Sequence, residues 1–406
     1  MGDVDMQFLD RTHRLEPGPL QRHLVDHDPV HRVDDHDPPF YVVSRQADVA
    51  DALRDVGTWR SAEGPGVEYT PGGVLGSTDR PDHTRQRRVV APAFTPAAMA
   101  ALEPRVAALA DRLFDAFVPL GRGDFVPLFA GPLPAIVIAD LLGVPPEDRD
   151  TFRRWSDDIV VGLGGENLEQ GERTRHEMAH YLLARIDERV AALAAVGRPL
   201  GEAALGDVVP DDLLARLAVA HHDEQLLTRP EMVSLALQIL VAGHETTTSL
   251  LGLLVYRLIE HPDVLARVRA DRRLVVPLIE ELLRFDSPVQ GLFRTNEHDV
   301  TLHGATIPAG TKVNLLFAAA NRDPARWDHP DVFDIDRPWG QLSHHMAFGY
   351  GIHFCLGAPL ARLEARLSLN RLLDRMDDLR LEGEPQVIRP FILRGLSSLP
   401  ISWTAR

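Results

Sequence analysis

The single cysteine of the chain lies in a run that restricts the local fold more than any other feature. The run is Phe348-Gly349-Tyr350-Gly351-Ile352-His353-Phe354-Cys355-Leu356-Gly357, and an apolar helical pattern follows it. Two glycines, Gly349 and Gly351, allow the loop to turn tightly. We expect a helix to begin just beyond Cys355 and to direct unpaired N–H groups and the positive end of its dipole at the sulfur. This arrangement favours a thiolate, although a lone cysteine is more often a small buried hydrophobic residue.

Composition and charge limit the class of protein. The 406 residues are 45% hydrophobic and 25% charged, as in a globular protein with an ample core. A formal net charge of -16 argues against general binding to nucleic acid or to an anionic membrane. Residues 1–6 have neither the basic start nor the apolar stretch of a signal or anchor, and the most apolar run, residues 232–243, is too short to span a bilayer. We therefore expect a cytoplasmic protein.

Hydrophobic periodicity predicts a mainly α fold with small β-sheets. Val106, Leu109, Leu113 and Phe117 fall on one helical face, and similar stripes recur over residues 148–196 and 211–217. Strands are predicted at residues 39–44, 300–304 and 312–316, the last two as a pair. Because no Gly-, Pro- or Ser-rich linker divides the chain, we expect one domain over residues 1–406.

A second informative segment, residues 240–248, lies within a helical run that starts near Thr228. Small residues at Ala242 and Gly243 leave space on one face, and the adjacent Glu245 and Thr246 place an acid beside a hydroxyl where they could organise water. The alternative is a buried helix whose threonine hydroxyls bond back to carbonyls. A zinc-peptidase motif is excluded because Thr248 stands where a second histidine would be needed.

Both segments resemble the cytochrome P450 family. The Cys355 run matches the pattern Phe-Gly-x-Gly-x-His-x-Cys-x-Gly of its haem-binding loop, and residues 242–247 match the Ala-Gly-x-Glu/Asp-Thr-Thr of its central helix. The resemblance implies the cytochrome P450 fold and haem b (iron protoporphyrin IX) with Cys355 as axial thiolate ligand. The residues implied in cofactor binding are His83, Arg87, Arg294, Phe348, Gly349, His353, Cys355 and Gly357.

Two further motifs fit this resemblance. His83 and Arg87 lie one helical turn apart and could hold a carboxylate; the family commonly has Asp-Pro-Pro-Glu-His-x-x-x-Arg there, and this chain departs from it at Arg80 and Asp82. With Arg294 and His353 they are implied to contact the haem propionates. The Glu281-x-x-Arg284 pair, completed by Arg337, resembles the family's structural triad, although most such pairs are surface salt bridges of small value.

The implied activity is a monooxygenase that inserts one atom of O2 into a C–H bond. Glu245 and Thr246 are the implied catalytic residues, relaying protons to the bound oxygen. Since the sequence contains no flavin or iron–sulfur motif, electrons are expected from a separate ferredoxin and ferredoxin reductase. Arginines such as Arg85, Arg88, Arg362 and Arg366 could steer this partner, although ordinary solvated helix charges are the usual role of any one of them. A monomer is expected.

The predicted substrate is a hydrophobic small molecule such as a steroid, terpenoid, polyketide or aromatic compound. The pocket is expected to draw on residues 64–76, on the region of residues 160–168, and on Val241, Ala242, Val289, Gln290, Leu292, Phe293, Phe391 and Ile392, with Gln290 as a polar contact. Two alternatives remain at this point. A haem-thiolate ligand carrier or sensor without turnover would share the Cys355 loop but have no need of Glu245 and Thr246, and a purely structural helical protein would bind no haem.

Overall fold

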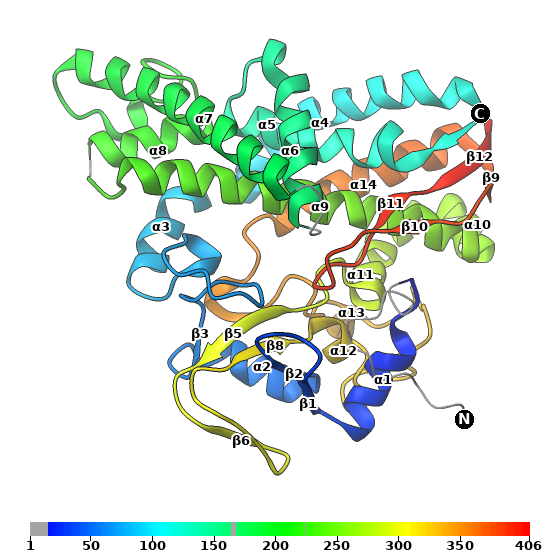
Figure 1. The fold of residues 1–406 in the computed structure, drawn as a ribbon. Coiled ribbons are helices and arrows are strands. Elements are labelled where there is room, and N and C mark those ends of the chain that lie inside the picture. The colour runs from blue at the N-terminus through cyan, green and yellow to red at the C-terminus, as the bar shows by residue number, and fades with distance from the viewer. Residues whose placement is uncertain (1–14, 164–167, 224) are drawn as a thin grey trace.

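The longest helix, α9 (Arg229–Glu260), crosses the middle of the helical part of the molecule (Figure 1). Thr228 and Glu231 form a reciprocal capping box at its start, and Pro230 lies in the first turn. The helix is long and apolar enough to cross a membrane, but 72% of its most apolar window is buried inside the protein. Helices α5, α7, α8 and α14 pack against it, so its apolar residues form the centre of the core.

The computed structural model describes residues 15–163, 168–223 and 225–406. Its helices are α1 (Gly18–His27), α2 (Gln46–Arg54), α3 (Asp82–Val90), α4 (Pro96–Phe117), α5 (Pro132–Leu142), α6 (Arg149–Leu163), α7 (Leu168–Val196), α8 (Leu213–His222), α9, α10 (Pro262–Ala270), α11 (Val275–Asp286), α12 (Phe317–Ala320), α13 (Trp339–Leu342) and α14 (Ala358–Arg375). The strands are β1 (Val30–Val33), β2 (Phe40–Val43), β3 (Trp59–Arg60), β4 (Arg122–Asp124), β5 (Leu292–Asn296), β6 (Val300–Leu302), β7 (Ala305–Ile307), β8 (Lys312–Leu315), β9 (Met376–Leu381), β10 (Gln386–Val387), β11 (Leu396–Ser398) and β12 (Pro400–Ala405). The predicted mainly α fold with small sheets is confirmed.

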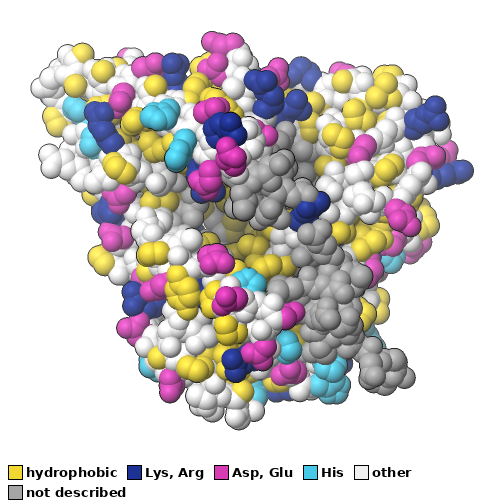
Figure 2. Space-filling view, viewed as in Figure 1, with side chains coloured by type: hydrophobic (Ala, Val, Ile, Leu, Met, Phe, Trp, Pro, Cys, Tyr) yellow, Lys and Arg dark blue, Asp and Glu magenta, His cyan; other side chains and the backbone are white. Residues whose placement is uncertain are grey.

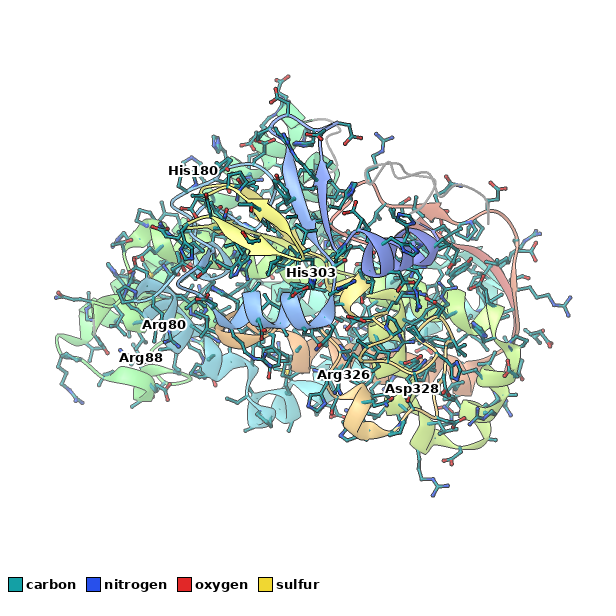
Figure 3. The ribbon with its side chains drawn as sticks, turned by 90° about the horizontal axis from the view of Figure 1, so that it is seen from below. Arg80, Arg88, His180, His303, Arg326 and Asp328 are labelled. Carbon is teal, nitrogen blue, oxygen red and sulfur yellow. The ribbon has the colours of Figure 1, made fainter. Side chains whose placement is uncertain are left out.

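The largest sheet has five strands in the order β1-β2-β8-β5-β3. Strand β8 is central, parallel to β2 and antiparallel to β5. The predicted strands at residues 39–44 and 312–316 are confirmed, but the predicted pairing of residues 300–304 with 312–316 is wrong. Strand β6 instead pairs with β7, because His303 and Gly304 both adopt positive φ and form a two-residue turn. The His303 ring, labelled in Figure 3, contacts Asp48 of α2 at 2.7 Å.

The core divides into a large cluster within the helices and two smaller clusters around the sheet. On α4 the predicted apolar face is correct, since Val106, Leu109 and Phe117 are buried and Leu113 packs against the same cluster. This division places the five-stranded sheet and the helical part on opposite sides of the segments that carry the predicted site (Figure 1).

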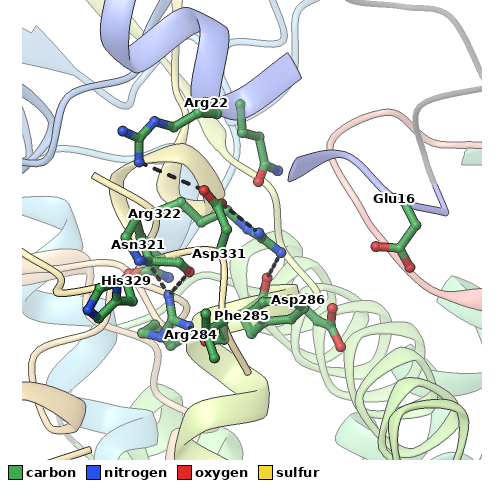
Figure 4. Close-up of polar contacts among 12 residues, drawn as sticks. Glu16, Arg22, Arg284, Phe285, Asp286, Asn321, Arg322, His329 and Asp331 are labelled. Carbon is green, nitrogen blue, oxygen red and sulfur yellow. Dashed lines mark hydrogen bonds and ion pairs between the residues drawn. The ribbon is translucent and has the colours of Figure 1, made fainter. Parts of the chain in front are cut away.

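A buried ionic network joins α11 to the chain before α14. The carboxylate of Glu281 accepts two hydrogen bonds of 2.7 Å from Arg284 and one of 3.1 Å from Arg337. Both arginines also donate to backbone carbonyls of residues 321–332. Nearby, Arg322 pairs with Asp331 and donates to the Phe285 carbonyl (Figure 4). All three charged groups of the triad are buried, and their hydrogen bonds link α11 to the backbone of residues 321–332.

Candidate functional site

The loop before α14 depends on its glycines. Gly349 and Gly351 have φ of +67° and +70°, a region that side chains rarely adopt. A Cβ atom at Gly351 would also lie 2.5 Å from the backbone oxygen of Leu53. The loop closes with a 2.9 Å hydrogen bond from the Cys355 backbone N–H to the Phe348 carbonyl. It therefore delivers Cys355 to the start of α14, as the sequence predicts.

The Cys355 sulfur lies among backbone donors and near two arginines. The backbone N–H groups of Gly357 and Ala358 donate hydrogen bonds to the sulfur, and Arg87 and Arg362 lie near enough to favour its charged form. Burial nevertheless outweighs them and raises the pKa of the thiol above its usual range. The donors at the start of α14 therefore do not by themselves lower the pKa of the thiol, and a bound cation at the sulfur would favour the thiolate.

The Phe348 ring, at the start of this loop, packs against an ion pair of Arg362 with Glu280, a residue that the sequence analysis did not identify. The guanidinium of Arg362 lies 4.5 Å from the centre of the Phe348 ring. It donates two hydrogen bonds, of 2.7 and 2.8 Å, to Glu280, which also contacts His345 at 3.0 Å. Burial alone would raise the pKa of Glu280, but the bonds from Arg362 and His345 lower it to about 2. The phenyl ring is thus fixed between the sulfur loop and a permanently ionised pair.

The four residues predicted to bind propionates converge in space from three separate segments. His83 and Arg87 come from α3, Arg294 from β5, and His353 from the loop. The rings of His83 and His353 are 4.3 Å apart. Burial first, and then the charges of Arg294, His83 and Arg87, lower the pKa of His353 to about 3. Burial also lowers the pKa of Arg294 to about 10.

This cluster has donors and positive charge, and the carboxylate of Asp79 attracts His83 and Arg294 without forming an ion pair with either of them. Among the residues described, none of its four members forms an ion pair with a carboxylate, and Nδ1 of His83 is buried without a hydrogen-bond partner. Arg294 bonds the carbonyl of Phe293, and Arg87 that of Phe354. Such groups require anionic partners. The two propionates of a haem next to Cys355 would meet this requirement.

Ser61 is a further member of the cluster that sequence reasoning missed. Its Oγ lies 3.1 Å from Nε2 of His353, and its backbone N–H donates to Asp79, as does that of Ala62. Asp79 is thereby occupied by backbone donors. A serine at the end of a two-residue strand carries no local signal, so only the tertiary structure identifies it.

The α9 segment at residues 241–248 presents a partly accessible face in the middle of a core helix. Ala242 is exposed and Val241 and Thr246 are half-buried, whereas Glu245 is buried. The helix is unbroken, and the Thr246 hydroxyl donates to the Ala242 carbonyl at 2.7 Å. Thr248 does the same to His244 at 3.1 Å. The back-bonding expected of a buried helix thus occurs, but on a face that remains open at Ala242 and Thr246.

His244 explains why α9 lies so close to α5 here. The imidazole is fully buried and hydrogen-bonds the Gly131 backbone, and burial lowers its pKa to about 4. A Cβ at Gly243 would lie only 3.0 Å from Ile138 of α5. The neutral histidine and the glycine therefore hold α9 against α5 and direct the adjacent residues to the other side.

The residues predicted to contact substrate fall into separate groups. Phe391 and Ile392 are half-buried and pack with Val67 against one sheet cluster, and Val289 and Leu292 pack against the other. Hydrophobic side chains gather in the hollow between the helical part and the sheet part in Figure 2. Residues 164–167 of the predicted pocket lie outside the described residues.

Two of the substrate predictions are corrected by the structure. The amide of Gln290 accepts a hydrogen bond from Gln21 at 2.7 Å and donates to the carbonyls of Asp286 and Ser287. Its polar atoms are thus engaged within the protein. Phe293 is fully buried and packs against Phe40, with ring centres 5.1 Å apart, so its side chain belongs to the core.

Three of the four arginines predicted to steer a redox partner are paired with carboxylates of the chain. Arg85 contacts Asp82 and Glu231, Arg362 contacts Glu280, and Arg366 contacts Glu103 at 2.8 Å. Arg88, which lies on α3 (Figure 3), also interacts with another group of the protein. These neighbouring carboxylates offset the positive charge, so the steering expected from these side chains is weaker than the sequence suggests.

Comparisons with known proteins agree with this geometry. A sequence model described as cytochrome P450 matches residues 163–394. The chain is 37% identical to the cytochrome P450 monooxygenase PikC of Streptomyces venezuelae, over 98% of this chain and 94% of that protein. It is also 37% identical to the vitamin D(3) 25-hydroxylase of Pseudonocardia autotrophica, over 100% and 98% of the two chains. The solved structure of CYP109Q5 from Chondromyces apiculatus superposes with a TM-score of 0.86 at 35% identity, covering 98% of each chain.

Proposed function

Because the chain belongs to the cytochrome P450 family and is a monooxygenase, we propose that Cys355 is the axial ligand of haem b and that the enzyme hydroxylates a hydrophobic small molecule. The observation that carries this proposal is the convergence of His83, Arg87, Arg294 and His353 beside the Cys355 loop, where none of them forms an ion pair with a carboxylate of the described residues. Two members of the cluster, His83 and Arg294, are buried, and polar groups in such surroundings are costly in isolation. A dianionic cofactor with a central metal cation would balance both the cluster and the sulfur.

Each residue near the Cys355 loop has a proposed role in holding the cofactor. His83, Arg87, Arg294 and His353 would hold the propionates, with Ser61 orienting the His353 ring through its 3.1 Å contact. The Gly357 and Ala358 N–H groups would share the charge of the sulfur. Thiolate-bound haem supplies the activation of dioxygen that C–H hydroxylation requires.

On α9, Thr246 and Glu245 are proposed to control proton delivery. The Thr246 hydroxyl donates its hydrogen to the Ala242 carbonyl. The lone pairs of Thr246 Oγ1 can therefore accept a hydrogen bond from a proton donor on the accessible face. Glu245, adjacent and buried, would exchange protons with water from the other side of the helix. Together they would hold a hydrogen-bonded proton donor at Thr246 Oγ1 and resupply its proton through Glu245.

The proposed substrate class is a hydrophobic molecule such as a steroid, terpenoid, polyketide or aromatic compound. Val241, Ala242, Val289, Leu292, Phe391 and Ile392 are apolar and partly accessible. Apolar walls with few polar contacts favour such ligands. Similarity to a vitamin D(3) hydroxylase supports the inclusion of steroid-like compounds.

We further propose that the enzyme is a cytoplasmic, monomeric, single-domain protein that receives electrons from a ferredoxin and its reductase. The net charge of -16 supports the absence of nucleic-acid and anionic-membrane partners.

The proposal is tested by titrating the purified ferric protein with a panel of steroids, terpenoids, macrolides and aromatic acids while recording the Soret band. A saturable low-to-high-spin shift with one class, followed by formation of a hydroxylated product with a ferredoxin system, is the expected result. Saturable binding of that compound without any oxidised product under reducing, aerated conditions would refute the proposed hydroxylation.

A further inference from the structure

Lys312 is the only lysine among 43 basic residues, and it occupies an unusual place. It begins the central strand β8, opposite Thr295 of β5, and only 1% of its surface is exposed. Lysine is among the residue types least often fully buried. A lone lysine in an arginine-rich chain, placed beneath the surface, therefore calls for a specific role.

The ammonium group of Lys312 binds two consecutive backbone carbonyls. Its Nζ donates to the oxygens of Glu63 and Gly64, both at 2.8 Å. These residues begin the loop 63–70, which closes on itself through a 2.9 Å hydrogen bond from Thr70 N to Glu63 O. Residues 63–70 are called the tethered loop below. One side chain of the rigid sheet thus fixes the base of an otherwise irregular segment.

Tyr69 adds a second link between this loop and the sheet. Its ring centre lies 5.1 Å from Nζ of Lys312, within the range of a cation–π contact. Its hydroxyl donates to the Gly310 carbonyl at 2.5 Å. Both links join the loop to the same end of β8.

The inner side of the tethered loop borders the predicted substrate contacts. The Phe293 N–H donates to the Pro65 carbonyl at 2.9 Å, next to Arg294 of the cationic cluster. Val67 packs in the same cluster as Phe391 and Ile392. A displacement of this loop would therefore move one wall of the proposed pocket.

The charges around Nζ explain why lysine suits this position. Burial lowers the pKa of Lys312 to about 8, opposed by Glu63 and Glu68 and assisted by Arg294. On the neighbouring strand β2, the titratable residue next to this site is Tyr41, which lies opposite Val313, the residue that follows Lys312. A lysine amine keeps two N–H donors after it loses its charge, whereas arginine cannot be neutralised. Both carbonyls can thus remain bonded in either state.

We propose that Lys312 is a positioning residue that ties the tethered loop to the sheet and thereby controls the passage of bulky ligands into the pocket. This inference rests on the proposed function, because the pocket is that of the monooxygenase. Small ligands would enter without loop movement, but bulky ones would require the two carbonyls to leave Nζ.

The absence of other lysines makes loop opening measurable in the wild-type holoenzyme. Acetylation by an amine-reactive ester is followed by mass spectrometry, with the N-terminal α-amino group as internal reference. We expect Lys312 to react at least about 100-fold more slowly than a free amine, because it reacts only when the loop opens. Saturating clotrimazole, a bulky haem-binding azole, should slow it further, and imidazole should not. A rate similar to that of the reference amine, or one unaffected by clotrimazole, would overturn the proposal.

Variants provide an independent test by stopped-flow spectroscopy of azole binding. Lys312→Met should raise both the association and dissociation rates of clotrimazole by about tenfold, the factor expected for losing a hydrogen bond from a charged group, and leave those of imidazole unchanged. Arg32→Met removes an exposed charge from β1 of the same sheet and should behave as wild type. Unchanged clotrimazole rates in Lys312→Met would contradict the proposal.

If Lys312→Met does not fold, the wild-type labelling decides the question. The proposed function and the proposed tether can fail separately. A protein that does not bind haem would refute the proposed function, whereas rapid labelling of Lys312 in haem-loaded protein would refute the tether alone.

Discussion

Replacement of Arg294 by methionine should change the stability of the haem-free and haem-bound protein in opposite directions. Burial lowers the pKa of Arg294 to about 10, so its charged form, present at neutral pH, costs the fold about 3 kcal/mol. Methionine has no such cost, although it loses one hydrogen bond to the Phe293 carbonyl, worth about 2 kcal/mol for a charged donor. The haem-free variant should therefore be about 1 kcal/mol more stable than wild type.

With haem bound, the sign reverses. The propionates would be the missing partners of Arg294, and removing one side of a buried charge pair typically costs about 3–5 kcal/mol. The assays are urea unfolding of protein made without haem, and transfer of haem from the holoprotein to an acceptor globin. Faster haem loss together with a more stable apoprotein is the expected result.

Arg322→Met is the matched control. Burial, then repulsion from Arg394, also lowers the pKa of Arg322 to about 10, but this side chain bonds Asp331 and the Phe285 carbonyl (Figure 4). Its removal should leave haem transfer unchanged. Destabilisation of the haem-free Arg294→Met protein, or haem transfer at the wild-type rate, would refute the reasoning about the cluster.

Three other predictions concern single contacts. Thr246→Ala should retain haem and substrate binding but divert reducing equivalents to hydrogen peroxide, measured as product formed per NAD(P)H consumed. Thr248→Ala removes a similar back-bond at a buried position and should keep electron consumption coupled to product. Equal coupling in both variants would exclude the role of Thr246. In a denaturant titration, Glu281→Gln should lower the unfolding free energy by about 3–5 kcal/mol because it leaves two arginines buried without an anion. Asp271→Asn, in the exposed pair with Arg273, should have no measurable effect in the same titration. Burial lowers the pKa of Lys312 to about 8, below its value in the unfolded chain. As the pH rises from 7 to 10, the folded protein loses this proton before the unfolded chain does, so the unfolding free energy of wild type should rise by up to about 3 kcal/mol relative to that of Lys312→Met. A constant difference in unfolding free energy over this range would show that the pKa of the amine is not lowered.

Features carried by local motifs were predictable from the sequence. The Cys355 loop could be identified because its glycines and the start of α14 are consecutive in the chain. The capping box of α9 is likewise local, as is the apolar face of α4. In each case the physical constraint acts between residues a few positions apart, so the pattern of side chains is sufficient.

Features that depend on distant contacts were missed or misjudged. Gln290 was predicted to face a substrate because it lies in an apolar segment, but Gln21, 269 residues away, binds its amide. The roles of Ser61 and Lys312 depend on His353 and on a loop nearly 250 residues away. The pairing of β6 with β7 followed from a turn at His303–Gly304 that was read as part of a strand. Periodicity carries no information about such partners.

The central claim is that Cys355 is the thiolate ligand of a haem, and the reduced carbon-monoxide difference spectrum tests it most directly. Wild-type protein should show the red-shifted Soret band of thiolate-ligated haem, and Cys355→Ser should bind haem without that band, since a hydroxyl is a much weaker ligand than a thiolate. The same band in both proteins, or no haem band in wild type supplied with haem, would contradict the account.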